Sequence, residues 1–190
     1  MRCRLRAHPP AAPVRFDPDS QGDEAHILAR ALSNLAARLR DAIPDLALGT
    51  DVIVGFPGET EADFEETLTV VEEMRYDSAF TFIYSPRRGT DAAAMADQVP
   101  EPVKHERLER LVEVVQRIAA ERNAERVGRV EQVLVEGPSR TDAALLRGRT
   151  RRNTTVVFTG TGQAGDLLDV AIEGSTSTTL RGRVAAVVPA

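Results

Sequence analysis

At 190 residues, the chain has room for one ordinary domain, or for a partial domain followed by a small one. It is 42% hydrophobic and 28% charged, which is typical of soluble globular protein, and no apolar run is long enough to span a bilayer. We therefore expect a cytoplasmic protein without a membrane segment. The one cysteine, Cys3, cannot alone form an intrachain disulfide, a tetrahedral zinc site or a cluster held by three thiolates.

The net charge of −5 is unevenly distributed along the chain. Residues 46–126 carry nine Lys and Arg against seventeen Asp and Glu, whereas residues 127–190 carry eight against six. Five arginines dominate the positive charge of this last segment: Arg140, Arg147, Arg149, Arg151 and Arg152. Such segregation indicates either a polyanionic partner for the C-terminal segment or a solvated surface loop.

The first thirty residues or so show neither helical nor strand periodicity and are rich in proline. We expect residues 1–31 to form a leader without regular structure. A helical pattern begins at about Ala25 and ends before Pro44, which cannot continue a helix. Its apolar face is expected to hold Ile27, Leu28, Leu32, Leu35 and Leu39.

The clearest local pattern is a strand, a glycine-rich turn and a helix. The run 46–54 is apolar and β-branched, as in a strand of a buried parallel sheet, and Gly55-Phe56-Pro57-Gly58 ends it. Thr60 and Asp63 predict a capping box at the start of the following helix. One stripe of that helix should be buried, and it consists of Phe64, Leu68, Val71 and Met74.

A second strand is predicted over 78–84, followed by the loop 85–90 and a long amphipathic helix over roughly 103–125 that Gly128 ends. The apolar face of this helix contains Leu108, Leu111, Val112, Val115, Ile118 and Ala119. Beyond a domain boundary at Val127, the pattern changes to short strands separated by glycine-containing turns. The five candidates are 130–135, 145–150, 154–158, 167–172 and 179–188. Five short antiparallel strands predict a small barrel of the OB type.

Two loops that follow strands are candidate ligand sites. The first loop consists of residues 55–59. Its glycines let a ligand approach the backbone, and the helix that follows presents free N–H groups to an anion. Glu59 could bind a ribose hydroxyl or an ammonium group, or the loop could be no more than a tight turn with an acidic start to its helix. In the second loop, Arg87 and Arg88 suit an anion such as RNA phosphate, or form a solvated hinge. The three histidines have no metal-ligand spacing, and we predict neither a catalytic residue nor a metal site.

Longer motifs give a family resemblance. TDVIVGFPGETEADFEETL followed by FTFIYSPRRGTDAA is similar to the C-terminal half of the radical S-adenosylmethionine (SAM) methylthiotransferases. The stretch 97–128 resembles the helix that joins their barrel to an RNA-binding domain known as TRAM, and VEGPSRTDAALLRGRTRRNTTVVF resembles the start of that domain in the branch acting on tRNA. The resemblance covers about residues 32–190.

The resemblance implies an α/β fold: the C-terminal portion of a radical SAM TIM-type barrel over 32–126, and an OB-like TRAM barrel over 127–190. It implies methylthiolation at carbon 2 of N6-isopentenyladenosine beside the anticodon, with SAM and two four-iron, four-sulfur clusters as cofactors and tRNA as partner. By the same resemblance, the SAM side of the barrel includes Gly55, Pro57, Gly58 and Glu59. The implied substrate and tRNA contacts are Arg87, Gly89, Thr90, Arg140, Arg147, Arg149, Arg151 and Arg152.

The chain departs from the family in lacking the cysteines of both clusters and the first barrel strands. We therefore expect a truncated or frame-shifted form that does not bind the cofactors fully and cannot perform the chemistry alone. An N-terminal fragment of the same enzyme is a candidate partner. The alternatives are an RNA-binding module without catalysis and a methylthiotransferase acting on a ribosomal protein. A partial barrel should also expose an apolar surface that is normally covered.

Overall fold

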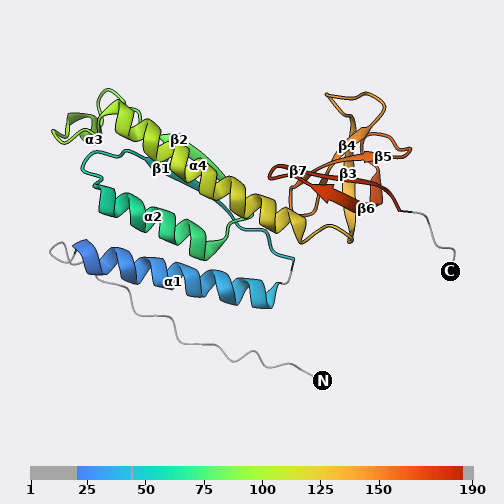
Figure 1. Cartoon of the computed structure of the whole chain (residues 1–190), viewed down its shortest axis with the longest axis horizontal. Coiled ribbons are helices and arrows are strands. Elements are labelled where there is room, and N and C mark those ends of the chain that lie inside the picture. Colours follow the sequence, from blue (N-terminus) through green and yellow to red (C-terminus); the bar gives the residue numbers. More distant parts are fainter. Residues whose placement is uncertain (1–20, 44, 186–190) are drawn as a thin grey trace, which may run out of the picture.

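The computed structural model describes residues 21–43 and 45–185, which form a layer of helices and strands followed by a small barrel (Figure 1). The layer contains helix α1 (Gln21–Ala42), strand β1 (Gly49–Val54), helix α2 (Glu61–Met74), strand β2 (Ser78–Ile83), the short helix α3 (Asp91–Ala94) and helix α4 (Glu101–Ala124). Within the described part of the chain, no helix combines the length and the apolar character that crossing a membrane requires.

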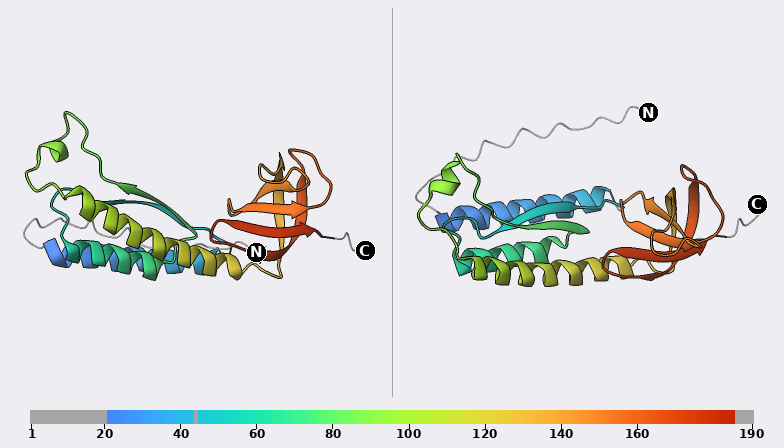
Figure 2. Two further views of the ribbon diagram at one scale, coloured as in Figure 1. Left: turned by 45° about the horizontal axis from the view of Figure 1, so that its top comes forward. Right: turned by 90° about the horizontal axis from the view of Figure 1, so that it is seen from above.

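Strands β1 and β2 pair in parallel, and the three long helices α1, α2 and α4 gather on one side of them (Figure 2). The inward face of this pair packs on α2 and α4 around Val54, Phe64 and Leu111, which are fully buried. The capping box at Thr60 and the buried stripe of α2 are confirmed. A parallel pair with helices on one side fits an α/β protein, and its extension into a TIM-type barrel stays a prediction.

The outward face of the sheet is apolar and exposed, as expected for a surface that is normally covered. Ile53, Phe80 and Phe82 lie on this face and are 56%, 68% and 49% exposed. Parallel sheets normally have both faces covered by other elements, and in the described part of this chain no element covers this face.

The first helix differs from its prediction. It begins at Gln21, so residues 21–31 of the predicted leader are helical, and residues 1–20 lie outside the described residues. Of its predicted apolar face, Leu32, Leu35 and Leu39 are exposed, and the side chains of Ile27 and Leu28 lie outside the described residues. The pattern identified the helix correctly, but within the described part α1 packs mainly on α2, which covers Ala36 rather than the leucine stripe.

The C-terminal barrel contains five strands, close to the predicted positions: β3 (Val130–Pro138), β4 (Leu146–Thr150), β5 (Thr155–Thr159), β6 (Leu167–Ser175) and β7 (Thr179–Val184). They close in the order β3-β4-β5-β7-β6 around Val133, Val135, Val156, Phe158, Val170, Ile172 and Leu180.

The expectation of an entirely antiparallel barrel is wrong, because β5 and β7 pair in parallel. Strand directions cannot alternate all the way around a closed ring with an odd number of members, so at least one neighbouring pair must be parallel. The predicted boundary at Val127 lies between the end of α4 at Ala124 and the start of β3. Gly128 lies in this connection, where its N–H donates to the Ile172 carbonyl at 2.8 Å, and not at the end of the helix.

Candidate functional site

The two candidate loops lie together at the carboxyl end of the parallel strands. The Tyr84 N–H donates to the Val54 carbonyl at 2.8 Å, and the rings of Phe56 and Tyr84 meet edge to face with centroids 5.2 Å apart. The chain beyond the second loop returns to the first, because the Gly58 N–H donates to the Asp97 carbonyl at 2.9 Å. Both loops therefore lie at the same end of the sheet.

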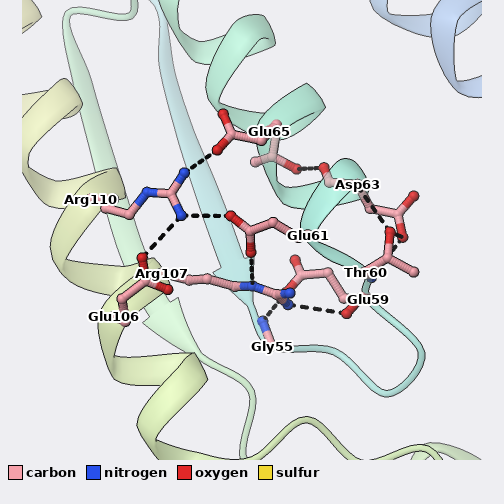
Figure 3. A network of polar contacts seen from close by, with 10 residues as sticks. Gly55, Glu59, Thr60, Glu61, Asp63, Glu65, Glu106, Arg107 and Arg110 are labelled. Carbon is pink, nitrogen blue, oxygen red and sulfur yellow. Dashed lines mark hydrogen bonds and ion pairs between the residues drawn. The ribbon is translucent and has the colours of Figure 1, made fainter.

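Glu59 holds the first loop in place from within the protein (Figure 3). Its Oε2 accepts a hydrogen bond from the Gly55 N–H at 2.6 Å and pairs with Nη1 of Arg107 at 2.7 Å. The same Nη1 donates to the Glu59 carbonyl at 3.1 Å. The two side chains are only 12% and 5% exposed, so this pair is largely shielded from water. This oxygen of Glu59 is thus already occupied by internal partners.

The glycines of this loop are required by close neighbours as well as by backbone angles. Gly55 and Gly58 have φ values of +76° and +85°, which residues with a Cβ rarely adopt. A Cβ at Gly55 would overlap the Lys104 side chain, and one at Gly58 would lie 2.9 Å from Oδ2 of Asp97. The internal packing of this chain therefore accounts for both glycines without a ligand.

The sequence analysis missed Lys104 and Arg107, the two buried cations of α4. Lys104 is 2% exposed, and its Nζ contacts Oε1 of Glu101 at 2.8 Å and the Tyr84 carbonyl at 3.4 Å. Their spacing could have predicted this burial. Positions 104 and 107 lie seven and four residues before Leu111, so all three fall on one face of the helix. Charged residues in phase with an apolar stripe need buried partners, and the first loop supplies a partner for Arg107.

The acidic start of α2 extends this network over the surface. Arg110 pairs with Glu61, Glu65 and Glu106, and Arg107 also reaches Glu61 at 3.3 Å. Hydrogen bonding to Arg110 lowers the pKa of Glu61, and the same contacts raise the pKa of Arg110. Favourable pairing on both sides keeps these groups ionised at neutral pH.

The second loop offers free positive charge. Arg87 and Arg88 are exposed and form no ion pair within the described residues. Thr90 has a local structural role: it caps α3, with its hydroxyl donating to the Arg87 carbonyl at 2.8 Å and accepting from the Ala93 N–H at 3.4 Å. Gly89, at φ +88°, has open space around it. Of the positions that the resemblance assigned here, Arg87 is the one with a charged side chain, and its role as an anion contact stays a prediction.

The barrel carries a cleft of about 550 Å³, which we call the barrel cleft, and its lining combines arginines and hydroxyl groups with Glu173 and with the apolar side chains of Leu145, Val157 and Phe158. Arg140, Arg147 and Arg181 line it together with hydroxyl groups of Ser139, Thr141, Thr155, Thr159, Thr176 and Thr179. Arg140 and Arg181 are exposed and form no ion pair within the described residues, and Arg147 contacts Glu136 at 3.4 Å. The sequence analysis did not single out Arg181, which is far from the other arginines along the chain and reaches them because β7 pairs with β5.

The other predicted tRNA contacts have different environments. Arg149 binds Glu136 at 3.0 Å, and its Nη1 donates to the carbonyl and the side-chain oxygen of Asn153. Arg151 is exposed and forms no ion pair among the described residues. Arg152 has a side chain only 9% exposed, and it pairs with Asp77 of the α/β layer. The adjacent arginines of this motif therefore differ in whether an external anion can reach them.

The described residues contain no group of three His, Cys, Asp or Glu side chains that could hold a metal ion. Iron-sulfur clusters need several thiolates, and the chain has Cys3 alone, which lies outside the described residues. The residues of this chain therefore do not fit the two clusters that the resemblance implies.

Comparison with known proteins supports the resemblance. The TRAM domain family matches residues 124–185, so the barrel is a TRAM domain. The chain is 52% identical over 150 residues to the tRNA-2-methylthio-N(6)-dimethylallyladenosine synthase of Clostridium botulinum strain Hall, covering 78% of this chain and 33% of that protein. It is 50% identical over 152 residues to proteins of the same name from Alkaliphilus oremlandii and Thermoanaerobacter sp. strain X514. The chain spans about a third of the length of the curated relatives it matches and resembles their C-terminal part.

Proposed function

We propose that this chain binds tRNA through its TRAM barrel, as the C-terminal part of a tRNA methylthiotransferase. The observation that carries the proposal is the barrel cleft, where three arginines from separate strands and loops line one cleft together with six hydroxyl groups. Guanidinium groups and hydroxyls are the side chains that most often contact phosphate oxygens and sugars. The relatives are named for a tRNA modification, which supports tRNA as the polyanion.

The reaction that this binding serves is methylthiolation at carbon 2 of an adenosine that carries an isopentenyl (dimethylallyl) group on N6. The names of the relatives support this substrate. These 190 residues supply no set of thiolates for iron-sulfur clusters, so the chemistry requires cysteines from an N-terminal part like the one that the relatives have. We propose that such an N-terminal fragment packs on the exposed sheet face of Ile53, Phe80 and Phe82.

The first loop has a limited part in this proposal. Gly55, Pro57, Gly58 and Glu59 match the motif that lines the SAM side in the family, but Oε2 of Glu59 is bound by Gly55 and Arg107. We propose that the Glu59–Arg107 pair fixes the shape of the loop. The loop backbone, rather than Oε2 of Glu59, then faces SAM. No step of the reaction is assigned to these residues.

Salt-dependent binding tests the proposal. Fluorescence anisotropy should show wild-type protein binding a labelled tRNA transcript with an affinity that falls as salt rises, because phosphate contacts release counterions. Each lost phosphate contact lowers the magnitude of the slope of log K against log salt by about 0.7 to 0.9, so Arg140→Ala/Arg147→Ala/Arg181→Ala should lower it by about two to three. Arg117→Ala is the control, since Arg117 is half exposed on α4 and does not line the barrel cleft. An unchanged slope in the triple variant would remove the barrel cleft as the tRNA-binding surface.

A further inference from the structure

Asp77 stands at the junction of the layer and the barrel, immediately before β2. Its Oδ2 accepts a hydrogen bond from the Leu48 N–H at 2.9 Å, and its Oδ1 accepts one from Nε of Arg122 at 3.2 Å. The same Oδ1 pairs with Nη2 of Arg152 from the barrel. The side chains of Asp77, Arg122 and Arg152 are 14%, 19% and 9% exposed, so one shielded carboxylate joins β2, α4 and the barrel.

The charges around Asp77 are unbalanced toward positive. Arg40 of α1 reaches the same region, where Nη2 of Arg40 donates to the Arg75 carbonyl at 2.8 Å. Burial lowers the pKa of Arg40, and the nearby charges of Arg122 and Arg152 lower it further, whereas Asp77 raises it. Asp77 therefore offsets the mutual repulsion of arginines that come from three different elements.

The end of α4 supplies further hydrogen bonds between the layer and the barrel. Nδ2 of Asn123 donates to the carbonyls of Thr176 and Ser177 at 2.9 and 3.2 Å. These bonds lie close to the covalent connection itself, so they hold the barrel near the helix end. The Asp77–Arg152 pair joins residues 75 positions apart in the sequence and attaches the barrel to the start of β2 as well as to α4. A second attachment on a different element restricts rotation of the barrel about the connection.

Orientation matters because the two basic surfaces lie at opposite ends of α4. The Arg87–Arg88 loop lies near the start of this helix and the barrel at its end (Figure 1). Its 24 residues span about 36 Å at 1.5 Å per residue. A fixed relative position that fits both surfaces to one RNA strengthens binding, because the effective concentration of the second contact depends on the length and stiffness of the link between the two surfaces.

We propose that Asp77 and Arg152 are positioning residues that hold the barrel cleft in register with the Arg87–Arg88 loop, so that one tRNA contacts both. The proposal rests on the function proposed above. It assigns Arg152 a different role from its neighbour Arg151, although the two look equivalent in the sequence. Arg151 is exposed to solvent, whereas Arg152 is held by Asp77.

The test compares Arg152→Ala with the matched control Arg151→Ala on two RNA probes. One probe is a tRNA transcript, and the other is a single-stranded RNA of about eight nucleotides, which a barrel of this size can hold alone. Arg152→Ala should weaken tRNA binding by about tenfold or more, through loss of the second surface, and leave binding of the short RNA unchanged. Arg151→Ala should change both affinities by the same factor. Arg152→Lys, which keeps the charge, should recover part of the tRNA affinity.

A distance measurement gives a second readout that does not depend on RNA. Spin labels at Glu66→Cys on α2 and Ala164→Cys on the barrel, with Cys3→Ser, report the orientation by electron paramagnetic resonance. The distance distribution should broaden for Arg152→Ala and stay narrow for Arg151→Ala.

Each pattern of results has one meaning. An equal loss of affinity for both RNA probes in Arg152→Ala would overturn the proposal, because Arg152 would then act within the barrel. Unchanged tRNA binding, or an unchanged distance distribution, would overturn it too. If the wild-type protein binds neither RNA, the proposed function fails, and the distance measurement still decides whether Asp77 and Arg152 fix the orientation.

Discussion

Replacement of Arg107 by alanine is the sharpest test of how the first loop is held. Arg107 is 4% exposed, and its guanidinium binds both the carboxylate and the carbonyl of Glu59. In Arg107→Ala, the largely buried Glu59 carboxylate keeps only the Gly55 N–H as a partner. Removing one member of a buried pair costs about 3 to 5 kcal/mol, and we expect about 3 kcal/mol because Glu59 keeps some access to water.

Urea unfolding followed by tyrosine fluorescence measures this loss selectively. The chain has no tryptophan, and its two tyrosines, Tyr76 and Tyr84, both lie in the α/β layer, so the signal reports that layer and not the barrel. Arg110→Ala is the control, because Arg110 pairs with three carboxylates that are each more than half exposed, and solvent-exposed pairs contribute little. A loss for Arg107→Ala no larger than for Arg110→Ala would refute the conclusion that the Glu59 pair holds the loop.

Three further perturbations address the helix cap, the barrel and the exposed sheet. Hydrogen bonds from Thr60 lower the pKa of Asp63. The Asp63 carboxylate therefore contributes its full stability above the ordinary aspartate pKa of 3.8, and this contribution is lost as the pH falls through the lower pKa of the folded state. Asp63→Asn should therefore show a smaller fall in melting temperature on acidification below pH 3.8 than the wild type; equal falls would contradict this. Gly148→Ala should disrupt the amide NMR spectrum of the barrel, because its Cβ would overlap the neighbouring strand backbone, whereas Gly174→Ala, with open space, should not. Phe80→Thr with Phe82→Thr should reduce concentration-dependent association in analytical ultracentrifugation, and undiminished association would show that this face is not responsible.

Several elements were predictable because their signals are local. The capping box of Thr60 and Asp63 needs only residues within one helical turn, and the structure contains it as expected. The five barrel strands follow from short apolar runs between turns, and the strands observed lie within a few residues of the predicted ranges. The helix over residues 21–42 was also identified, although its start and its buried side were not. The side of α1 that is buried depends on what packs against it, and periodicity does not contain that information.

The sequence by itself determined that this chain has a loop of glycines and an acid after a strand, an arginine-rich segment in a small barrel, and a single thiol. Only the tertiary structure determined which groups each charged side chain contacts. It showed that Arg107 pairs with Glu59, and that Arg181 and Arg140 line the same barrel cleft. It also showed that Arg152, which was predicted to contact RNA, pairs with Asp77. The physical reason is that a charge acts over a few ångströms of space, while these partners are between 41 and 75 residues apart along the chain.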